Sequence, residues 1–281
     1  MRIEADVVVC SSSGWAHAVS TSGAKLVYCH APARWLYQSA AYLGGLGRTA
    51  HVAAHALREP LKRWDKRAAR SAARYVVNSS HVARAVREIY GCEPEIVPPP
   101  PVLAPAGPHR RVRGIAPGFV LCVSRLLAYK NVDAVVDAFA RLPAERLVVV
   151  GDGPEAESLR LHAGSNVRFL GGVDDATLRW LYANANGLVS ASYEDYGLTP
   201  LEAASFGKPT AALRFGGFLD TIVPGKTGVF FEAPQPEAIA CAIEQLLSQR
   251  WPAATLERHA QRFSAERFAA RMRAIVAEVA P

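Results

Sequence analysis

Two acidic and two basic residues stand where strand-like segments of this sequence give way to helix-like ones. Glu194 and Glu202 bound a stretch that follows an apolar run, and Arg125 and Lys130 lie in a second stretch of the same kind. A diphosphate needs its two charges matched, and arginine offers a bidentate fork while lysine offers a point charge. The four side chains together predict a diphosphate site, whereas each pair alone is also explained as surface charge.

The segment between the two glutamates contains the start of a predicted helix. Thr199 fits the N-cap position and Pro200 the first helical position. Free N–H groups at a helix start suit a phosphate, and Gly197 lets the backbone approach a ligand closely. The same residues also fit a capping box, in which Glu202 caps its own helix. Both interpretations stay open at this level.

Short β-branched segments alternate with helical patterns along the chain, which is typical of a parallel α/β sheet. The C-terminal part predicts strands at 119–123, 146–150, 167–170, 187–190, 209–213 and 228–231. It predicts helices at 131–141, 155–162, 174–184, 200–206, 236–248, 255–262 and 264–279. Because ligands bind at the carboxyl ends of parallel strands, we expect Lys130 and Glu194 at one edge of the sheet.

The N-terminal part predicts fewer elements. They are strands at 6–10, 26–29, 75–77 and 95–97 and helices at 61–74 and 81–90. A run of four prolines from Pro98 to Pro101 forms a stiff segment that is a natural linker. We therefore expect an N-terminal domain at 1–108, a C-terminal domain at 109–262 and a final helical segment at 263–281.

At these positions the sequence resembles glycosyltransferase family 4, the retaining group 1 transferases of the GT-B fold. The resemblance rests on the Glu-x7-Glu motif at Glu194 and Glu202 and on the preceding Arg125 and Lys130, and it covers about 119–275. It implies an α/β protein with two Rossmann-like domains that face a cleft, the N-terminal one shortened. The final helical segment would pack back toward the N-terminal domain.

The resemblance implies how a nucleotide sugar would be held. Arg125 and Lys130 would neutralise the departing diphosphate, Glu202 would hold ribose hydroxyls and Glu194 would contact the donor sugar. The positions implied in donor binding are Arg125, Lys130, Gly172, Val173, Glu194, Gly197, Leu198, Thr199 and Glu202. The GDP- or UDP-linked donor is itself the substrate, with no further cofactor. No Asp-x-Asp metal motif occurs in the right context, so a metal-independent reaction is expected.

The stretch around His30 and Arg34 resembles the His-x-Pro-x-Arg segment of bacterial mannosyltransferase-like members. His30 would then lie across the cleft from Glu194, near the transferred sugar. The implied catalytic residues are Glu194, His30, Arg125 and Lys130. The implied acceptor side consists of Ser13, Gly14 and Arg34. A structural histidine with a backbone partner is the alternative for His30.

The N-terminal part departs from the family pattern. About four strands are predicted where the family normally has six or seven, and the glycine-rich loop that normally opens the chain is not found. A truncated chain, a minimal enzyme and a non-catalytic relative each explain this difference. If units are missing, a second copy or a partner chain would cover the exposed strand edge and apolar faces.

Positive charge is concentrated in the N-terminal part. Residues 1–114 hold 16 Lys and Arg against 7 Asp and Glu, and the remainder holds 16 against 18. Seven of these cations fall between positions 58 and 74: Arg58, Lys62, Arg63, Lys66, Arg67, Arg70 and Arg74. Leu61, Trp64 and Ala68 recur at helical spacing and are expected on the inner face. The outer face fits an anionic membrane surface or a solvated helix, whereas nucleic acid is disfavoured because no nucleic-acid motif is present.

Other features of the sequence bear on its compartment. No apolar run reaches the ~18 residues that a membrane span needs, and the start lacks the pattern of a signal peptide. The cysteines show no short pair spacing, so we expect reduced core residues. They are Cys10, Cys29, Cys92, Cys122 and Cys241. A cytoplasmic protein, peripheral on the inner face of the membrane, is expected.

The function implied by the resemblance is transfer of a hexose, with mannose or glucose favoured. The donor would be a nucleotide diphosphate sugar, and the acceptor a hydroxyl of a glycan, a lipid-linked sugar or a small molecule. Two other classes stay open. A non-catalytic nucleotide-sugar-binding or partner-activating subunit is favoured by the short first domain. A glycan phosphorylase or synthase on the same fold would usually have a much longer chain.

Overall fold

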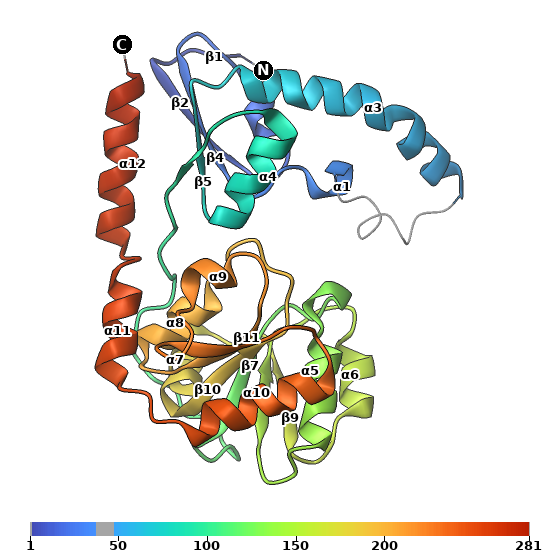
Figure 1. Cartoon of the computed structure of the whole chain (residues 1–281), viewed down its shortest axis with the longest axis vertical. Coiled ribbons are helices and arrows are strands. Elements are labelled where there is room, and N and C mark those ends of the chain that lie inside the picture. The colour runs from blue at the N-terminus through green and yellow to red at the C-terminus, as the bar shows by residue number, and fades with distance from the viewer. Residues whose placement is uncertain (1, 38–47, 281) are drawn as a thin grey trace. The chain divides into compact units, whose positions relative to one another are not determined.

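The computed structural model describes residues 2–37 and 48–280, and for residues 48–56 it describes the backbone alone. The chain divides into two compact units (Figure 1). Unit 1 consists of Met1–Pro99 and Glu266–Pro281, and unit 2 consists of Pro100–Ala265. Each unit is built on a parallel sheet. The α/β class that the alternating pattern predicts is confirmed.

A six-stranded parallel sheet forms the centre of unit 2, in the spatial order β12-β11-β10-β7-β8-β9. Its strands are β7 Phe119–Val123, β8 Leu147–Val150, β9 Val167–Gly171, β10 Ala185–Ser190, β11 Thr210–Leu213 and β12 Gly228–Phe231. The chain passes from β7 outward to β8 and β9, and then returns to the other side of β7 as β10. The sheet therefore has a topological switch point between β7 and β10, where ligands of such sheets bind.

Helices cover both faces of this sheet. The helices of unit 2 are α5 Val132–Ala140, α6 Ala156–His162, α7 Asp175–Asn184, α8 Thr199–Ser205, α9 Phe218–Thr221, α10 Pro236–Ser248 and α11 Ala253–Gln261. Of these, α11 packs against α8. Neighbouring residues of β7 face opposite sides. Val120 packs in one apolar cluster with α5 and α10, and Leu121 packs in another with α7. This alternation is the two-residue period of a strand, and it buries the sheet on both faces.

Unit 1 is built on a four-stranded parallel sheet of order β2-β4-β5-β6, beside a two-stranded pair. Its elements are β1 Arg2–Ile3, β2 Val7–Ser12, β3 Ser20–Thr21, β4 Ala24–Cys29, α1 Arg34–Tyr37, α3 Arg48–Arg70, β5 Arg74–Val77, α4 Ser80–Tyr90, β6 Glu95–Ile96 and α12 Ala265–Val279. Val27 packs with α4 on one face, whereas Leu26 packs with Ile275 of α12 on the other. The last helix of the chain therefore completes the core of unit 1 (Figure 1).

Residues 100–108 group with unit 2, although the proline pattern assigns them to the N-terminal domain. Leu103 is buried and packs in the same cluster as Ile115. Arg179 Nε donates a hydrogen bond of 2.9 Å to the carbonyl of Ala104. These contacts attach Leu103 and Ala104 to unit 2, which agrees with a unit boundary at Pro99.

The helix α3 differs from its prediction at both ends. It spans Arg48–Arg70 with Pro60 inside it, whereas the sequence predicts a helix over 61–74. A proline removes one backbone donor, and here the helix continues through it despite that loss. The helix ends at a turn in which Ser71 Oγ donates to the carbonyl of Ala68 and accepts from Lys25 Nζ.

Trp64 does not lie on the inner face of α3, where the apolar spacing predicts it. Its side chain is 42% exposed, and its ring meets that of Trp15 edge-on at 5.2 Å between centroids. Trp15 meets Trp35 in the same way at 4.4 Å. Among the side chains of α3 that the structure describes, the buried ones are Asp65 and Ala69. The apolar spacing predicts the wrong buried face of α3, because Asp65 is buried there together with polar partners.

The five cysteines are free, and only three of them are buried. Cys10, Cys29 and Cys122 lie in the cores of the two units, as the sequence predicts. Cys92 is partly buried and packs against the core of unit 1, whereas Cys241 is exposed on α10, so the expectation of core cysteines is wrong for Cys241. The next two residues of α10, Ala242 and Ile243, are buried. Cys241 therefore lies on the outer side of the helix.

Asp65 is the polar anchor of α3 in unit 1. Its carboxylate is fully buried and accepts a hydrogen bond of 2.8 Å from Tyr37 Oη. His17 Nε2 lies 2.9 Å from the other carboxylate oxygen, and this histidine is 1% exposed. A buried carboxylate is tolerated only when such partners replace water. Asp65 thus links α3 to the segments that carry His17 and Tyr37.

We predict that Asp65→Ala lowers the free energy of unfolding by about 2–4 kcal/mol, because His17 and Tyr37 lose a buried partner. Denaturant titration followed by tryptophan fluorescence measures the effect, since Trp15, Trp35 and Trp64 all lie in unit 1. The matched control is Glu59→Ala, which removes an exposed carboxylate from the same helix and should leave the midpoint unchanged. Equal midpoints for the two variants would contradict the anchor role.

Candidate functional site

The switch point of unit 2 brings one predicted cation and one predicted acid into contact. Lys130 ends the short 3-10 helix Ala128–Lys130 after β7, and Glu194 lies in the loop after β10. Lys130 Nζ donates to Glu194 Oε1, and the two side chains are 9% and 26% exposed. Charges removed from water to this degree need a close partner, which each finds in the other. Lys130 and Glu194 therefore lie at one edge of the sheet, as the sequence predicts.

Arg125 lies beside this pair and is exposed. Its Nη2 donates a hydrogen bond of 3.3 Å to Tyr129 Oη. The Tyr129 ring lies below Lys130 Nζ, at 5.0 Å from the ring centroid, which is a cation–π distance. One tyrosine thus contacts both predicted cations. Sequence reasoning missed Tyr129, although it stands directly before Lys130.

Hydrogen bonds tie the loop after β7 to the loop after β10. The amide of Tyr193 donates to the carbonyl of Tyr129 at 3.3 Å. Asn131 Nδ2 donates to the carbonyl of Ala191 at 2.7 Å. Ser192 Oγ donates to the carbonyl of Lys130 at 3.5 Å. The contact between Lys130 and Glu194 therefore belongs to two loops that are joined along their length.

Two glycines after β11 form the floor of the Glu194 loop. The amide of Gly217 donates to the carbonyl of Glu194 at 3.0 Å. A Cβ on Gly216 would lie 1.9 Å from that same carbonyl oxygen, so only glycine fits there. Gly197 has φ +82°, and its own Cβ would lie 2.4 Å from the Phe218 ring. The sequence signal that could have found this floor is a Gly-Gly pair directly after a predicted strand.

Glu202 is buried, and protein groups already occupy its carboxylate. Tyr182 Oη donates a hydrogen bond of 2.9 Å to Glu202 Oε2, and the backbone N–H groups of Val102 and Leu103 lie near the carboxylate. Burial raises the pKa of the Glu202 carboxyl, and these three donors oppose the shift. The carboxylate therefore holds the first residues of unit 2 against α7 and α8.

The capping box predicted at Thr199 does not form. Leu198 is the N-cap of α8, and no side chain caps the helix. The amides of Leu201 and Glu202 bond the carbonyl of Leu198 instead. The helix begins one residue earlier than predicted, and the Glu202 side chain turns to Tyr182. The prediction that Thr199 is the N-cap is wrong, and so is the interpretation that Glu202 caps its own helix.

Gly172 and Val173 follow β9 at the same edge of the sheet. The amide of Gly172 donates to Asp152 Oδ2 at 2.6 Å, and Asp152 belongs to the loop after β8. Val173 packs against the apolar cluster of α7. The loops after β7, β8, β9 and β10 therefore all lie along one edge, as a parallel sheet requires.

The predicted residues of unit 1 gather at the carboxyl edge of its own sheet. His30 directly follows β4, and its Nε2 lies 2.9 Å from Ser11 Oγ. Asn78 Nδ2 donates to the carbonyl of His30 at 3.1 Å, and the amide of His30 donates to the carbonyl of Ser12. Burial lowers the pKa of His30, which favours the neutral imidazole. The carbonyl and the amide of His30 both have hydrogen-bond partners, which agrees with a structural role, and its ring lies beside the Ser11 hydroxyl.

The predicted acceptor-side residues lie close in sequence to this edge. Ser13 is exposed directly after β2. The carbonyl of Gly14 accepts a hydrogen bond of 3.1 Å from Ser12 Oγ. Arg34 is the first residue of α1 and is partly buried.

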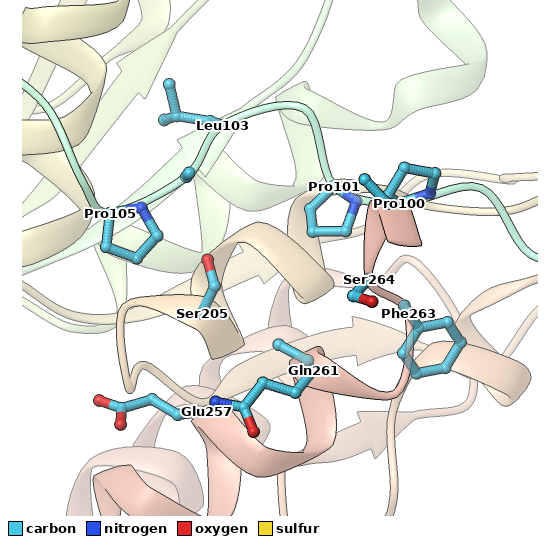
Figure 2. Close-up of a pocket in the computed structure, with 12 residues that line it drawn as sticks. Pro100, Pro101, Leu103, Pro105, Ser205, Glu257, Gln261, Phe263 and Ser264 are labelled. Carbon is cyan, nitrogen blue, oxygen red and sulfur yellow. The ribbon is translucent and has the colours of Figure 1, made fainter. Parts of the chain in front are cut away.

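A second concave region of unit 2 is a cavity of about 500 Å³ (Figure 2). Its walls come from the proline-rich segment, the end of α8, helix α11 and the segment that follows α11. They include Pro100, Pro101, Leu103, Ser205, Glu257 and Phe263. No lysine, arginine or histidine lines it. A diphosphate needs cations, so the switch point and not this cavity suits it.

Among the described residues, no group of three or more His, Cys, Asp or Glu side chains could hold a metal ion. Arg125, Lys130 and Glu194 are charged groups that this edge of unit 2 offers a ligand. They can match a phosphate through the cations and hydroxyl groups through the carboxylate.

Comparison with known proteins shows the family to which the chain belongs. The model of the family Glycosyl transferases group 1 matches residues 109–266, more than half of the chain. Glycogen synthase from Thermus thermophilus is 36% identical over 145 residues, which are 49% of this chain and 33% of that protein. D-inositol 3-phosphate glycosyltransferase from Geodermatophilus obscurus is 34% identical over 224 residues, 69% of this chain and 50% of that protein. The chain thus spans a third to a half of the length of these relatives.

A solved structure supports the fold over nearly the whole chain. Sucrose-phosphate synthase from Thermosynechococcus elongatus superposes with a TM-score of 0.77 at 21% identity, covering 97% of this chain and 73% of that one. At this identity the likeness concerns the fold alone. With the family match, it confirms the expected GT-B class.

We predict that Glu202→Gln destabilises unit 2 by about 1–3 kcal/mol, because the new NH2 group would face hydrogen-bond donors. Thermal unfolding measures the loss. The stability of the wild-type chain relative to this variant should decrease as the pH rises above 4.5, the usual pKa of glutamate. Burial raises the pKa of the Glu202 carboxyl, so its ionisation costs free energy in the folded state.

The matched control is Glu257→Gln, which alters an exposed carboxylate of α11. It should unfold at the wild-type temperature at every pH. If Glu202→Gln behaves in the same way, the buried carboxylate does not contribute to the stability of unit 2.

Proposed function

From the premise that this chain belongs to the group 1 glycosyl transferases, we propose that it transfers a hexose, mannose or glucose, from a nucleotide diphosphate sugar to an acceptor hydroxyl with retention of configuration. The observation that carries the proposal is the contact of Lys130 with Glu194 at the switch point, beside Arg125. A cationic pair and a carboxylate at the carboxyl ends of two neighbouring strands suit a diphosphate joined to a sugar.

The proposed reaction is a front-face displacement. The bond between the anomeric carbon and the diphosphate oxygen breaks, and the acceptor oxygen bonds to the same face of that carbon. The acceptor proton passes to the departing diphosphate oxygen. Negative charge grows on the diphosphate, so Arg125 and Lys130 stabilise the transition state more than the bound donor. No protein group needs to change its protonation state.

The donor would be held by groups from four strand ends. Glu194 would accept hydrogen bonds from sugar hydroxyls, and the backbone of Gly197, Leu198 and Thr199 would hold phosphate or sugar. Gly172 and Val173 would lie near the base. Glu202 would contact the ribose through the lone pairs that Tyr182 leaves free, because an ionised carboxylate offers about four lone-pair positions.

Unit 1 would supply the acceptor side. His30 would contact the transferred sugar as a neutral imidazole, which agrees with its lowered pKa. Ser13, Gly14 and Arg34 would lie beside the acceptor. The GDP- or UDP-linked donor would be the only small molecule required besides the acceptor.

We predict that the purified chain binds either GDP or UDP, and that Arg125→Ala/Lys130→Ala weakens this binding by at least about 100-fold. Each cation removed takes a charge-assisted hydrogen bond from the diphosphate, worth roughly 1.5–3 kcal/mol. Calorimetric titration measures the dissociation constants. The matched control is Arg250→Ala/Arg258→Ala, which removes the same charge from exposed positions near α10 and α11.

The control variant should bind as the wild type does. Binding that survives the Arg125→Ala/Lys130→Ala change would contradict the proposed donor site. A folded chain that binds neither nucleotide would remove the transferase proposal altogether and leave a partner-dependent subunit as the better account.

We further propose that unit 1 docks on an anionic membrane surface through α3. No described helix is long and apolar enough to cross a bilayer. The outward side of α3 instead combines exposed apolar groups, Leu57 and Trp64, with the exposed cations Arg63, Arg67 and Arg70. Helices that lie in the membrane interface join apolar and cationic stripes in this way. Because Trp64 is exposed and not on the inner face of α3, its side chain is available to contact a membrane surface.

We predict that the chain sediments with vesicles that contain an anionic lipid and not with neutral vesicles. Arg63→Glu/Arg67→Glu should weaken this association at least about 30-fold, since each surface cation contributes about 1 kcal/mol and reversal adds repulsion. Arg250→Glu/Arg258→Glu makes the same change of charge in unit 2 and should bind normally. Equal sedimentation with both kinds of vesicle would rule out docking through these charges.

A further inference from the structure

Asn131 adopts a backbone conformation that side chains rarely take. Its φ is +50° and its ψ is +39°, and among the described residues other than glycine it alone has a positive φ. Asparagine tolerates this left-handed region better than most residues. The residue stands directly after Lys130 and directly before α5, at the switch point of the sheet.

The side chain of Asn131 does not do what its position favours. An asparagine at the N-cap normally accepts a hydrogen bond from the first turn of its helix. Asn131 is the N-cap of α5, yet its side chain makes no cap hydrogen bond. Its Nδ2 donates instead to the carbonyl of Ala191 at 2.7 Å, across to the loop after β10. Departures from local preference of this kind are typical of functional positions.

The bond to Ala191 joins the two loops that carry the charged pair. Ala191 is 1% exposed and lies three residues before Glu194, and Asn131 is the neighbour of Lys130. The other described hydrogen bonds between these loops, from Tyr193 and from Ser192, are longer, at 3.3 and 3.5 Å. Because hydrogen bonds weaken with length, the amide of Asn131 is the firmest uncharged link between the loops.

We propose that Asn131 is a positioning residue for the transfer reaction, which latches the loop after β7 to the loop after β10. The left-handed backbone turns the side-chain amide away from α5 and toward Ala191. The latch fixes the separation of Lys130 and Glu194 when a donor enters and competes for both charges. The catalytic role of Asn131 rests on the proposed function. The effect of its hydrogen bond on the two loops does not depend on any ligand.

Two substitutions separate the latch from the backbone shape. Asn131→Gly keeps the left-handed conformation at no steric cost and removes the amide donor. Asn131→Asp keeps the size and also tolerates this conformation, but an ionised carboxylate cannot donate to the Ala191 carbonyl. A protonated aspartic acid can donate again. The aspartate variant should therefore regain the latch as the pH falls toward its pKa of about 4.

The first test is amide hydrogen exchange of the ligand-free chain. In Asn131→Gly the amides of residues 191–198 should exchange at least about tenfold faster, as expected when a loop opens locally. Exchange in β10 and in the core of α5 should stay as in the wild type, which shows that the variant is folded. Unchanged exchange in 191–198 would overturn the latch, whether or not the chain proves to be a transferase.

The second test uses turnover with the donor that the chain binds. Both variants should lose about 10- to 100-fold in kcat with less than about threefold change in nucleotide affinity, because misplaced groups slow the reaction more than binding. The ratio of Asn131→Asp to wild-type activity should rise between pH 7 and pH 5, and the ratio for Asn131→Gly should not. Parallel pH profiles for the two variants would contradict the proposed hydrogen bond.

Discussion

The contact between Lys130 and Glu194 is the interaction around which unit 2 is arranged. Both side chains are largely removed from water, so each depends on the other or on a ligand for its stability. The pair lies between β7 and β10, the two strands at which the chain reverses its direction across the sheet. In the proposed reaction, a diphosphate sugar that entered there would meet a cation and a carboxylate that are already partly removed from water and paired with each other. Such a pair can exchange partners with little rearrangement.

Several tertiary contacts serve to hold that pair in place. The glycines after β11 leave room for the carbonyl of Glu194, and Asn131 joins the loop of Lys130 to that of Glu194. These groups carry no charge and were not suggested by any charged motif. Their arrangement explains why the site needs the whole parallel sheet: each contributing loop leaves a different strand at the same edge.

The sequence predicts the strands and helices of unit 2 well, because alternating strands and helices leave a strong periodic signal. It predicts the partners of buried groups poorly. Glu202 fits a capping box in sequence, yet its carboxylate accepts a hydrogen bond from Tyr182, a contact that local spacing does not reveal. Trp64 fits an apolar stripe, yet Asp65 takes the buried position because His17 and Tyr37 surround it. Both errors arise where polar contacts distant in sequence outweigh local pattern.

A crystal structure of the chain with UDP or GDP tests the central claim most directly. The account predicts the diphosphate between the loops after β7 and β10, with its oxygens within about 3 Å of the Arg125 guanidinium and the Lys130 ammonium. Lys130 would then share its hydrogen bonds between Glu194 and the phosphate. A nucleotide bound elsewhere, with the contact of Lys130 and Glu194 unchanged, would contradict the account.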